Sequence, residues 1–157
     1  MNEENSLECG GVAFEEIRVG MSANSSHTIT DADIRTYAQL SGDFNPVHFS
    51  EEYALSSRFK GRIAHGLYSA GFFSALFGTQ LPGPGCVYVS QTLSFKLPVY
   101  LGDTVTAEIK VIAVDDRKRR VFFDTTCSVK GVIVIEGKAE LYVRKRQPPA
   151  TAQGDLK

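Results

Sequence analysis

The longest stretch without a charged residue sets the strongest constraint on the fold of this chain. No Asp, Glu, Lys or Arg occurs from Ile63 to Phe95. Within that stretch, residues 66–79 carry apolar or small side chains on nearly every helical face, which is typical of a helix enclosed by its own fold. Glycines and prolines interrupt the stretch before about 20 continuous apolar residues accumulate, so it predicts a buried interior segment and not a membrane span.

The period of the apolar residues changes to two after the turn at 82–85. Alternation from Val87 to Phe95 predicts a half-buried strand. Three further segments predict strands by the same pattern: 105–111, 121–129 and 133–143. Three or four long antiparallel strands and one buried helix indicate an α+β domain whose sheet wraps around that helix.

Length and composition indicate one globular domain. The chain has 157 residues, of which 43% are hydrophobic, so we predict a single domain over 1–157 with an ordered core at about 14–145. The net charge of −1 argues against a general nucleic-acid binder, because such proteins need a basic face for the phosphates.

The cysteines and the first residues favour a cytoplasmic protein. Cys9, Cys86 and Cys127 are odd in number and lack metal-ligand spacing, which predicts reduced thiols and neither a disulfide framework nor a zinc site. Residues 1–10 contain glutamates and no basic residue, which fits neither a secretory signal nor a transit peptide.

Two helices are predicted upstream of the uncharged stretch. Thr30 offers an N-cap for a helix that Gly42 ends, and Ser50 offers a cap for a short second helix to about Ser56. The segment between them places Asp43 and His48 side by side. Such a pair suits chemistry on a bound water, while an equally simple interpretation makes Asp43 a solvated cap beside an Asx turn.

A resemblance to a known family favours the chemical interpretation. The segment 37–54 resembles the hydratase motif of the MaoC-like family, the (R)-specific enoyl-CoA hydratases. The residues that carry this likeness are Tyr37, Leu40, Ser41, Gly42, Asp43, Asn45, Pro46, Val47, His48, Glu51 and Ala54. Further similar positions follow in order: Ile63, Ala64, His65, Gly66, Leu81, Pro82, Gly83, Gly85, Gln91, Leu93, Phe95, Pro98, Val99, Gly102 and Asp103. The likeness covers roughly residues 15 to 143.

The resemblance implies a hot-dog fold, in which the sheet wraps the central helix and the first helical region overhangs it. It also implies a homodimer whose sheets join edge to edge, and the hydration of trans-2-enoyl-CoA to (R)-3-hydroxyacyl-CoA. That product suits fatty acid metabolism or the supply of polyhydroxyalkanoate precursors. Coenzyme A is part of the substrate, and we expect no separate cofactor, no metal, no nucleic acid and no membrane partner.

The resemblance also suggests roles for particular residues. Asp43 and His48 would hold the attacking water, and the sequence leaves open which of them is the base. Gly66, at the start of the buried helix, would offer its N–H to the oxyanion, with entry of the chain into the helix as the alternative role. His65 is interpreted as a structural residue, hydrogen-bonded near the helix start.

Three further expectations concern substrate binding. Ser74 is predicted to reach the Asp43 and His48 end of the site, or else to bond to its own helix. Phe77 is predicted to shorten the acyl cavity and so to favour short chains, or else to be core. The cations at 58, 60 and 62 are either a solvated loop or contacts to coenzyme A phosphates.

Two other functions remain as alternatives. A hot-dog acyl-CoA thioesterase would use an acidic residue to hydrolyse the thioester. A non-catalytic acyl-CoA-binding protein would have no need of both Asp43 and His48.

Overall fold

The computed structural model describes residues 10–146. Our expectations for the first nine residues, for Cys9 and for the tail from residue 147 lie outside the described residues. Within the described range, no helix is long and apolar enough to span a bilayer.

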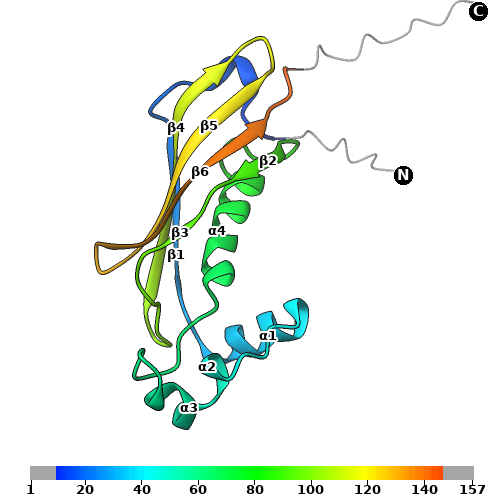
Figure 1. Ribbon diagram of the computed structural model, residues 1–157. Helices are drawn as coiled ribbons and strands as arrows, with labels where there is room; N and C mark the ends of the chain where they lie inside the picture. Colours follow the sequence, from blue (N-terminus) through cyan, green and yellow to red (C-terminus); the bar gives the residue numbers. More distant parts are fainter. Residues whose placement is uncertain (1–9, 147–157) are drawn as a thin grey trace, which may run out of the picture.

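One antiparallel sheet forms the body of the domain (Figure 1). Its strand order is β1-β4-β5-β6-β2, with β3 also paired to β6. The strands are β1 (Ser22–Thr28), β2 (Val87–Gln91), β3 (Ser94–Phe95), β4 (Thr104–Asp115), β5 (Arg120–Val129) and β6 (Val132–Tyr142). A charged turn at 116–119 connects β4 to β5, and β1 and β2 form the two edges of the sheet.

The long helix α4 (Gly66–Thr79) lies against the sheet, which curves around it (Figure 1). Phe73, Leu76 and Phe77 of α4 are fully buried. They meet the inward residues of the longest strands, which alternate as the sequence predicts: Val105, Ala107, Ile109, Val111, Val121, Phe123, Thr125 and Cys127. The predicted α+β hot-dog architecture, with a sheet around one central helix, is confirmed.

The first helical region overhangs one end of the sheet, beneath the start of α4 (Figure 1). Helix α1 (Asp31–Ser41) begins at a capping box in which Thr30 accepts from the Asp33 N–H, and it ends at Gly42, whose φ of 80° lies in the left-handed region. Helix α3 (Glu51–Ser56) begins at Ser50, as predicted. The overhanging segment is therefore organised by its caps.

Two short elements were not predicted. The Asn45 side chain accepts from the Val47 N–H, as in the Asx turn considered above, and this contact caps one further helical turn, α2 (Pro46–Phe49), with Pro46 at its first position. A 3-10 turn, η1 (Phe14–Glu16), precedes β1. Single turns like these are stabilised by local caps and leave little periodic signal in the sequence.

The strand predicted over 87–95 is corrected in two respects. It is divided into β2 and β3, and its large apolar residues are exposed where a buried face was expected, among them Val87, Val89 and Phe95. The reason is position, because β2 is an edge strand with no neighbour on its outer side. The outer face of α4 beside it is also open, with Leu67 and Ser74 exposed.

Candidate active site

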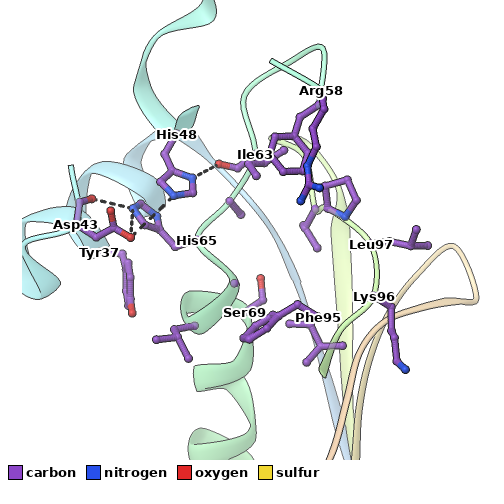
Figure 2. A pocket seen from close by; sticks show the side chains of 17 residues that line it. Tyr37, Asp43, His48, Arg58, Ile63, His65, Ser69, Phe95, Lys96 and Leu97 are labelled. Carbon is purple, nitrogen blue, oxygen red and sulfur yellow. Dashed lines mark hydrogen bonds and ion pairs between the residues drawn. The ribbon is translucent and has the colours of Figure 1, made fainter. Parts of the chain in front are cut away.

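A cavity of about 400 Å³ lies where the overhanging segment meets the start of α4 (Figure 2). Asp43, His48 and His65 line one side of it, and Gly66 lies at the helix end. Phe95 of β3 and Leu97, just after that strand, form part of the opposite wall. Arg58 lies across the cavity from Asp43 in Figure 2 and gives that end a positive charge, whereas the amine of Lys96, which also lines the cavity, is paired with Glu136 at 2.7 Å. The structure thus brings together the three residues predicted for the chemistry.

Asp43 is held through its main chain. Its N–H donates to Ser41 Oγ at 3.2 Å, and its carbonyl accepts a hydrogen bond from His65 Nε2 at 2.9 Å. Its Oδ1 accepts from the Asn45 N–H at 3.1 Å, while its side chain remains 49% exposed. One carboxylate oxygen, Oδ1, is therefore used for the local turn, while the other, Oδ2, faces His48. The two interpretations of Asp43 are compatible.

His48 lies on α2 and is buried. Its Nδ1 lies 2.7 Å from the Ile63 carbonyl, which can only accept, so Nδ1 carries the proton and Nε2 presents a lone pair. That Nε2 lies 3.9 Å from Asp43 Oδ2. Burial lowers the pKa of His48 below its ordinary value of 6.5, although the bond to Ile63 works against this effect. The imidazole is accordingly neutral near pH 7.

Gly66 is the first residue of α4. Among the described residues, no acceptor lies within hydrogen-bonding distance of its N–H. Because the first N–H groups of a helix have no partner within it, this one can bond a ligand in the cavity. A Cβ on Gly66 would come within 2.6 Å of the Phe95 ring, so glycine also keeps that side of the cavity open.

Ser74 and Phe77 are not among the residues that line this cavity. Eight residues beyond Gly66, a helix has advanced about 12 Å and turned about 80° from its starting direction. Ser74 consequently lies on the open face of α4, beside Tyr88 and Val89 of β2. Phe77 is fully buried against Phe123 and Tyr88, which makes it a core residue.

Three residues near the site carry roles that the sequence did not predict. Arg62 donates from Nε to the His48 carbonyl at 2.7 Å and binds Asp31 at the start of α1, so it links two parts of the overhanging segment and is not free for phosphates. Ser69 lines the cavity with a buried hydroxyl that has no partner among the described residues. His65 bonds to Asp43 and not to its own helix. The partners of Arg62 and His65 are distant in sequence, and two of these partners are main-chain carbonyls, so no sequence motif indicates the contacts.

A metal would have to use Asp43, His48 and His65, whose ligand atoms lie within 4.8 Å of one another. The two imidazole rings are stacked, with centroids 3.8 Å apart and planes inclined by 30°. The nitrogen lone pairs lie in the ring planes, and planes this close to parallel do not bring two lone pairs together on one ion at about 2.0–2.1 Å. The donor set therefore fits a metal poorly, and the chemistry below needs none.

Comparison with known proteins identifies the family. A model of the MaoC like domain matches residues 15–136. The chain belongs to this MaoC-like family.

Two curated relatives and one solved structure show how similar other MaoC-like proteins are. An (R)-specific enoyl-CoA hydratase of Rhodospirillum rubrum is 53% identical over 133 residues, which cover 85% of this chain and 92% of the relative. A 3-hydroxybutyryl-CoA dehydratase of Methylorubrum extorquens is 43% identical, covering 85% of each chain. The solved (R)-hydratase from A. caviae, involved in PHA biosynthesis, superposes with a TM-score of 0.80 at 38% identity, covering 82% of this chain and 98% of that one.

Proposed function

We propose that this protein is an (R)-specific enoyl-CoA hydratase, which adds water across the double bond of trans-2-enoyl-CoA to give (R)-3-hydroxyacyl-CoA. The observation that carries the proposal is the pairing of the Asp43 carboxylate with a neutral His48 Nε2 in one cavity with the free N–H of Gly66. Its relatives support the substrate and the stereochemistry, because the similar protein from R. rubrum is an (R)-specific enoyl-CoA hydratase.

Asp43 and His48 would bind one water between them. Their facing atoms, 3.9 Å apart, are too distant to bond directly, but a water can lie about 2.8 Å from both. His48 Nε2 takes a proton from this water while Asp43 Oδ2 accepts from its other O–H and orients it. The resulting hydroxide attacks the β-carbon of the enoyl thioester.

Attack at the β-carbon moves the electron pair of the double bond onto the thioester oxygen. The Gly66 N–H, at the positive end of the α4 dipole, donates to that oxygen and stabilises the enolate. The enolate then collapses, and the imidazolium of His48 delivers its proton to the α-carbon. Water has been added across the double bond, and both side chains return to their starting states.

Coenzyme A would extend from the thioester toward the positive end of the cavity. Arg58 lines this end and stacks on Phe59, with its guanidinium carbon 4.8 Å from the ring centroid. A guanidinium exposed in this way suits the phosphates of the carrier. Of the three cations singled out in the sequence, Arg58 is therefore the phosphate contact we propose.

The active form would be a homodimer in which β2 of one protomer pairs with β2 of the other. Edge strands with exposed apolar side chains pair readily with other strands. Here β2 exposes Val87, Tyr88 and Val89. The groove between β2 and α4 is lined mainly by apolar side chains, together with Ser74, Ser90 and Gln91. A second copy would cover this groove and place Ser74 at the interface.

We assign the reaction to the cytoplasm and to fatty acid metabolism, with supply of polyhydroxyalkanoate precursors as the specific use. The free thiols of Cys86 and Cys127 suit a reducing compartment. The solved A. caviae (R)-hydratase involved in PHA biosynthesis supports the specific use.

One assay separates this proposal from its alternatives. The protein is mixed with crotonyl-CoA, and both the absorbance of the conjugated enoyl group and the free thiol are followed. Hydration removes the absorbance without releasing thiol, and chiral analysis should give the (R) product. Thiol release would indicate a thioesterase, no change would indicate a binding protein, and an (S) product would contradict the assignment.

A further inference from the structure

His65 lies at the centre of the site, yet the reaction proposed above does not use it. Its side chain is only 2% exposed. It is the N-cap residue of α4, but its side chain makes no capping hydrogen bond. Its ring lies between those of Tyr37 from α1, with centroids 4.9 Å apart, and His48 from α2, with centroids 3.8 Å apart. Three separate elements thus meet at this one imidazole.

Two of the contacts of His65 go to the two catalytic residues. Nε2 is 2.9 Å from the Asp43 carbonyl, and since a carbonyl can only accept, Nε2 carries a proton and donates it. The ring face covers that of His48, with the planes inclined by 30°. The hydrogen bond restrains the main chain from which the Asp43 carboxylate extends, and the stacking restrains rotation of the His48 ring.

We propose that His65 is a positioning residue for hydration, holding the Asp43 carboxylate and the His48 imidazole at the separation that accommodates one water. This inference rests on the proposed function and adds a residue to it. A misplacement of about 1 Å in such a pair can cost about 100-fold in rate, so restraint of both partners by one side chain has a direct effect on turnover.

Packing alone does not account for a histidine here. Nδ1 of His65 is buried and has no partner among the described residues, and a buried polar atom left unpaired costs about 1–3 kcal/mol. A phenylalanine would fill a comparable volume and stack on both neighbouring rings without that cost. What it lacks is the hydrogen bond to Asp43.

His65 also acts electrostatically on His48. Burial is the largest cause of the lowered pKa of His48, and the neighbouring His65 lowers that pKa further, whereas Ile63 and Asp43 raise it. The groups facing His48 are the Asp43 carboxylate from the loop after α1, the His65 ring from the start of α4, and the Arg62 guanidinium on its carbonyl. Replacing His65 by Phe or Gln removes one cause of the lowering.

The test compares two variants that each keep one contact. His65→Phe keeps a ring and loses the donor, whereas His65→Gln keeps a donor and loses the ring. The control is His27→Gln, which removes an exposed histidine bonded to Asp33 and Tyr68 outside the cavity. For each protein we would measure kcat and KM with crotonyl-CoA, the pH profile of kcat/KM, and the thermal midpoint.

We expect His65→Phe to remain folded with a midpoint near or above that of the wild type, while kcat falls at least about tenfold and KM changes little. His65→Gln should recover part of kcat, and both variants should move the acid limb of kcat/KM to higher pH. His27→Gln should match the wild type. If His65→Phe does not fold, His65→Gln alone carries the test through kcat and the acid limb.

Folded His65 variants with wild-type kcat and an unmoved acid limb would overturn the inference. So would a fall in kcat that only follows the loss of folded protein. A wild-type protein that does not hydrate crotonyl-CoA would instead contradict the proposed function, so the two failures are distinguishable.

Discussion

Asp43 Oδ2 and His48 Nε2 face each other across 3.9 Å, and each residue is held from behind by a different bond. The Asp43 carbonyl accepts from His65, and His48 Nδ1 donates to the Ile63 carbonyl. Both bonds leave the reactive atoms free. This arrangement leads to the following predictions.

Asp43→Asn and His48→Gln should each reduce kcat for crotonyl-CoA by at least about 100-fold, since general acid–base groups contribute about 10²–10⁴. Both replacements are close in size to the native residue, so the fold should survive. Steady-state kinetics beside a thermal melt checks this. A variant with wild-type turnover and an unchanged midpoint would show that its residue is not catalytic.

Gly66→Pro should remove the oxyanion donor, and it also places a Cβ against the Phe95 ring. Proline is favoured at the first position of a helix, and the preceding residue, His65, already has the extended backbone that proline requires, with φ −61° and ψ 128°. Loss of one such donor costs about 100- to 1,000-fold in kcat.

The matched control is Gly66→Ala, which also brings a Cβ against the Phe95 ring but keeps the N–H. The rate ratio between the two variants isolates the hydrogen bond. Equal rates for the alanine and proline variants would count against the proposed role of Gly66.

The activity should persist to pH values below 6.5, the ordinary pKa of histidine. A base must be neutral, and because burial lowers the pKa of His48, its protonation and the loss of kcat/KM come at lower pH. A profile of kcat/KM between about pH 4.5 and 9 would locate the pH at which activity is lost on the acid side, the acid limb. A limb at or above the ordinary value would contradict the assignment of His48 as a buried, neutral base.

The same shift predicts how stability depends on pH. The unfolded chain protonates His48 at the ordinary value, whereas the folded protein resists protonation, so the unfolded state binds more protons as the pH falls. The free energy of unfolding is therefore lost as the pH falls from about 6.5 through the lowered pKa of the folded state. Denaturant melts should show a smaller loss over this range for His48→Gln than for the wild type.

Two Phe→Ala variants should differ in what they change, since one should lower the stability and the other should alter the preference for acyl chain length. Phe77→Ala removes a fully buried ring and should lower the free energy of unfolding by about 3–5 kcal/mol without changing the preference between crotonyl-CoA and dodecenoyl-CoA. Phe95→Ala removes a ring that is 52% exposed and lines the cavity, so it should cost little stability and favour the longer substrate. Ratios of kcat/KM for the two substrates would decide which phenylalanine limits the chain length.

Val89→Lys should convert the dimer to a monomer, because a lysine on an edge strand opposes strand pairing. Sedimentation at matched concentrations would measure this change. The control, Val19→Lys, alters an exposed apolar residue just before β1, at the opposite edge of the sheet, and should remain dimeric. A wild-type protein that sediments as a monomer would refute the proposed interface.

Where a structural feature is recorded in consecutive residues, the sequence was sufficient to predict it. The apolar run predicted α4 with its observed bounds, and alternation predicted the buried faces of β4 and β5. The likeness to the family motif predicted that Asp43, His48 and Gly66 belong to one site. None of these expectations required knowledge of distant contacts.

The errors arose where distant contacts decide the outcome. Ser74 was assigned from its helical spacing to Gly66, whereas its direction on α4 is set by which face the sheet covers. The apolar pattern of β2 indicated burial but gave no sign that its side chains are left exposed by residues 10–146. The sequence did not reveal the partner of His65, because that partner is the main-chain carbonyl of Asp43, and every residue carries such an acceptor.

The link through Arg62 has a consequence for which parts of the site can move together. One guanidinium holds both the His48 carbonyl and Asp31 at the start of α1, so the helix before the catalytic loop and the short helix after it are tied as one body. That body is also joined to the start of α4, because His65 bonds to the Asp43 carbonyl and stacks on His48. A displacement of the overhanging segment would therefore carry Asp43, His48 and the helix N-terminus together, leaving the spacing of the groups that bind the water unchanged.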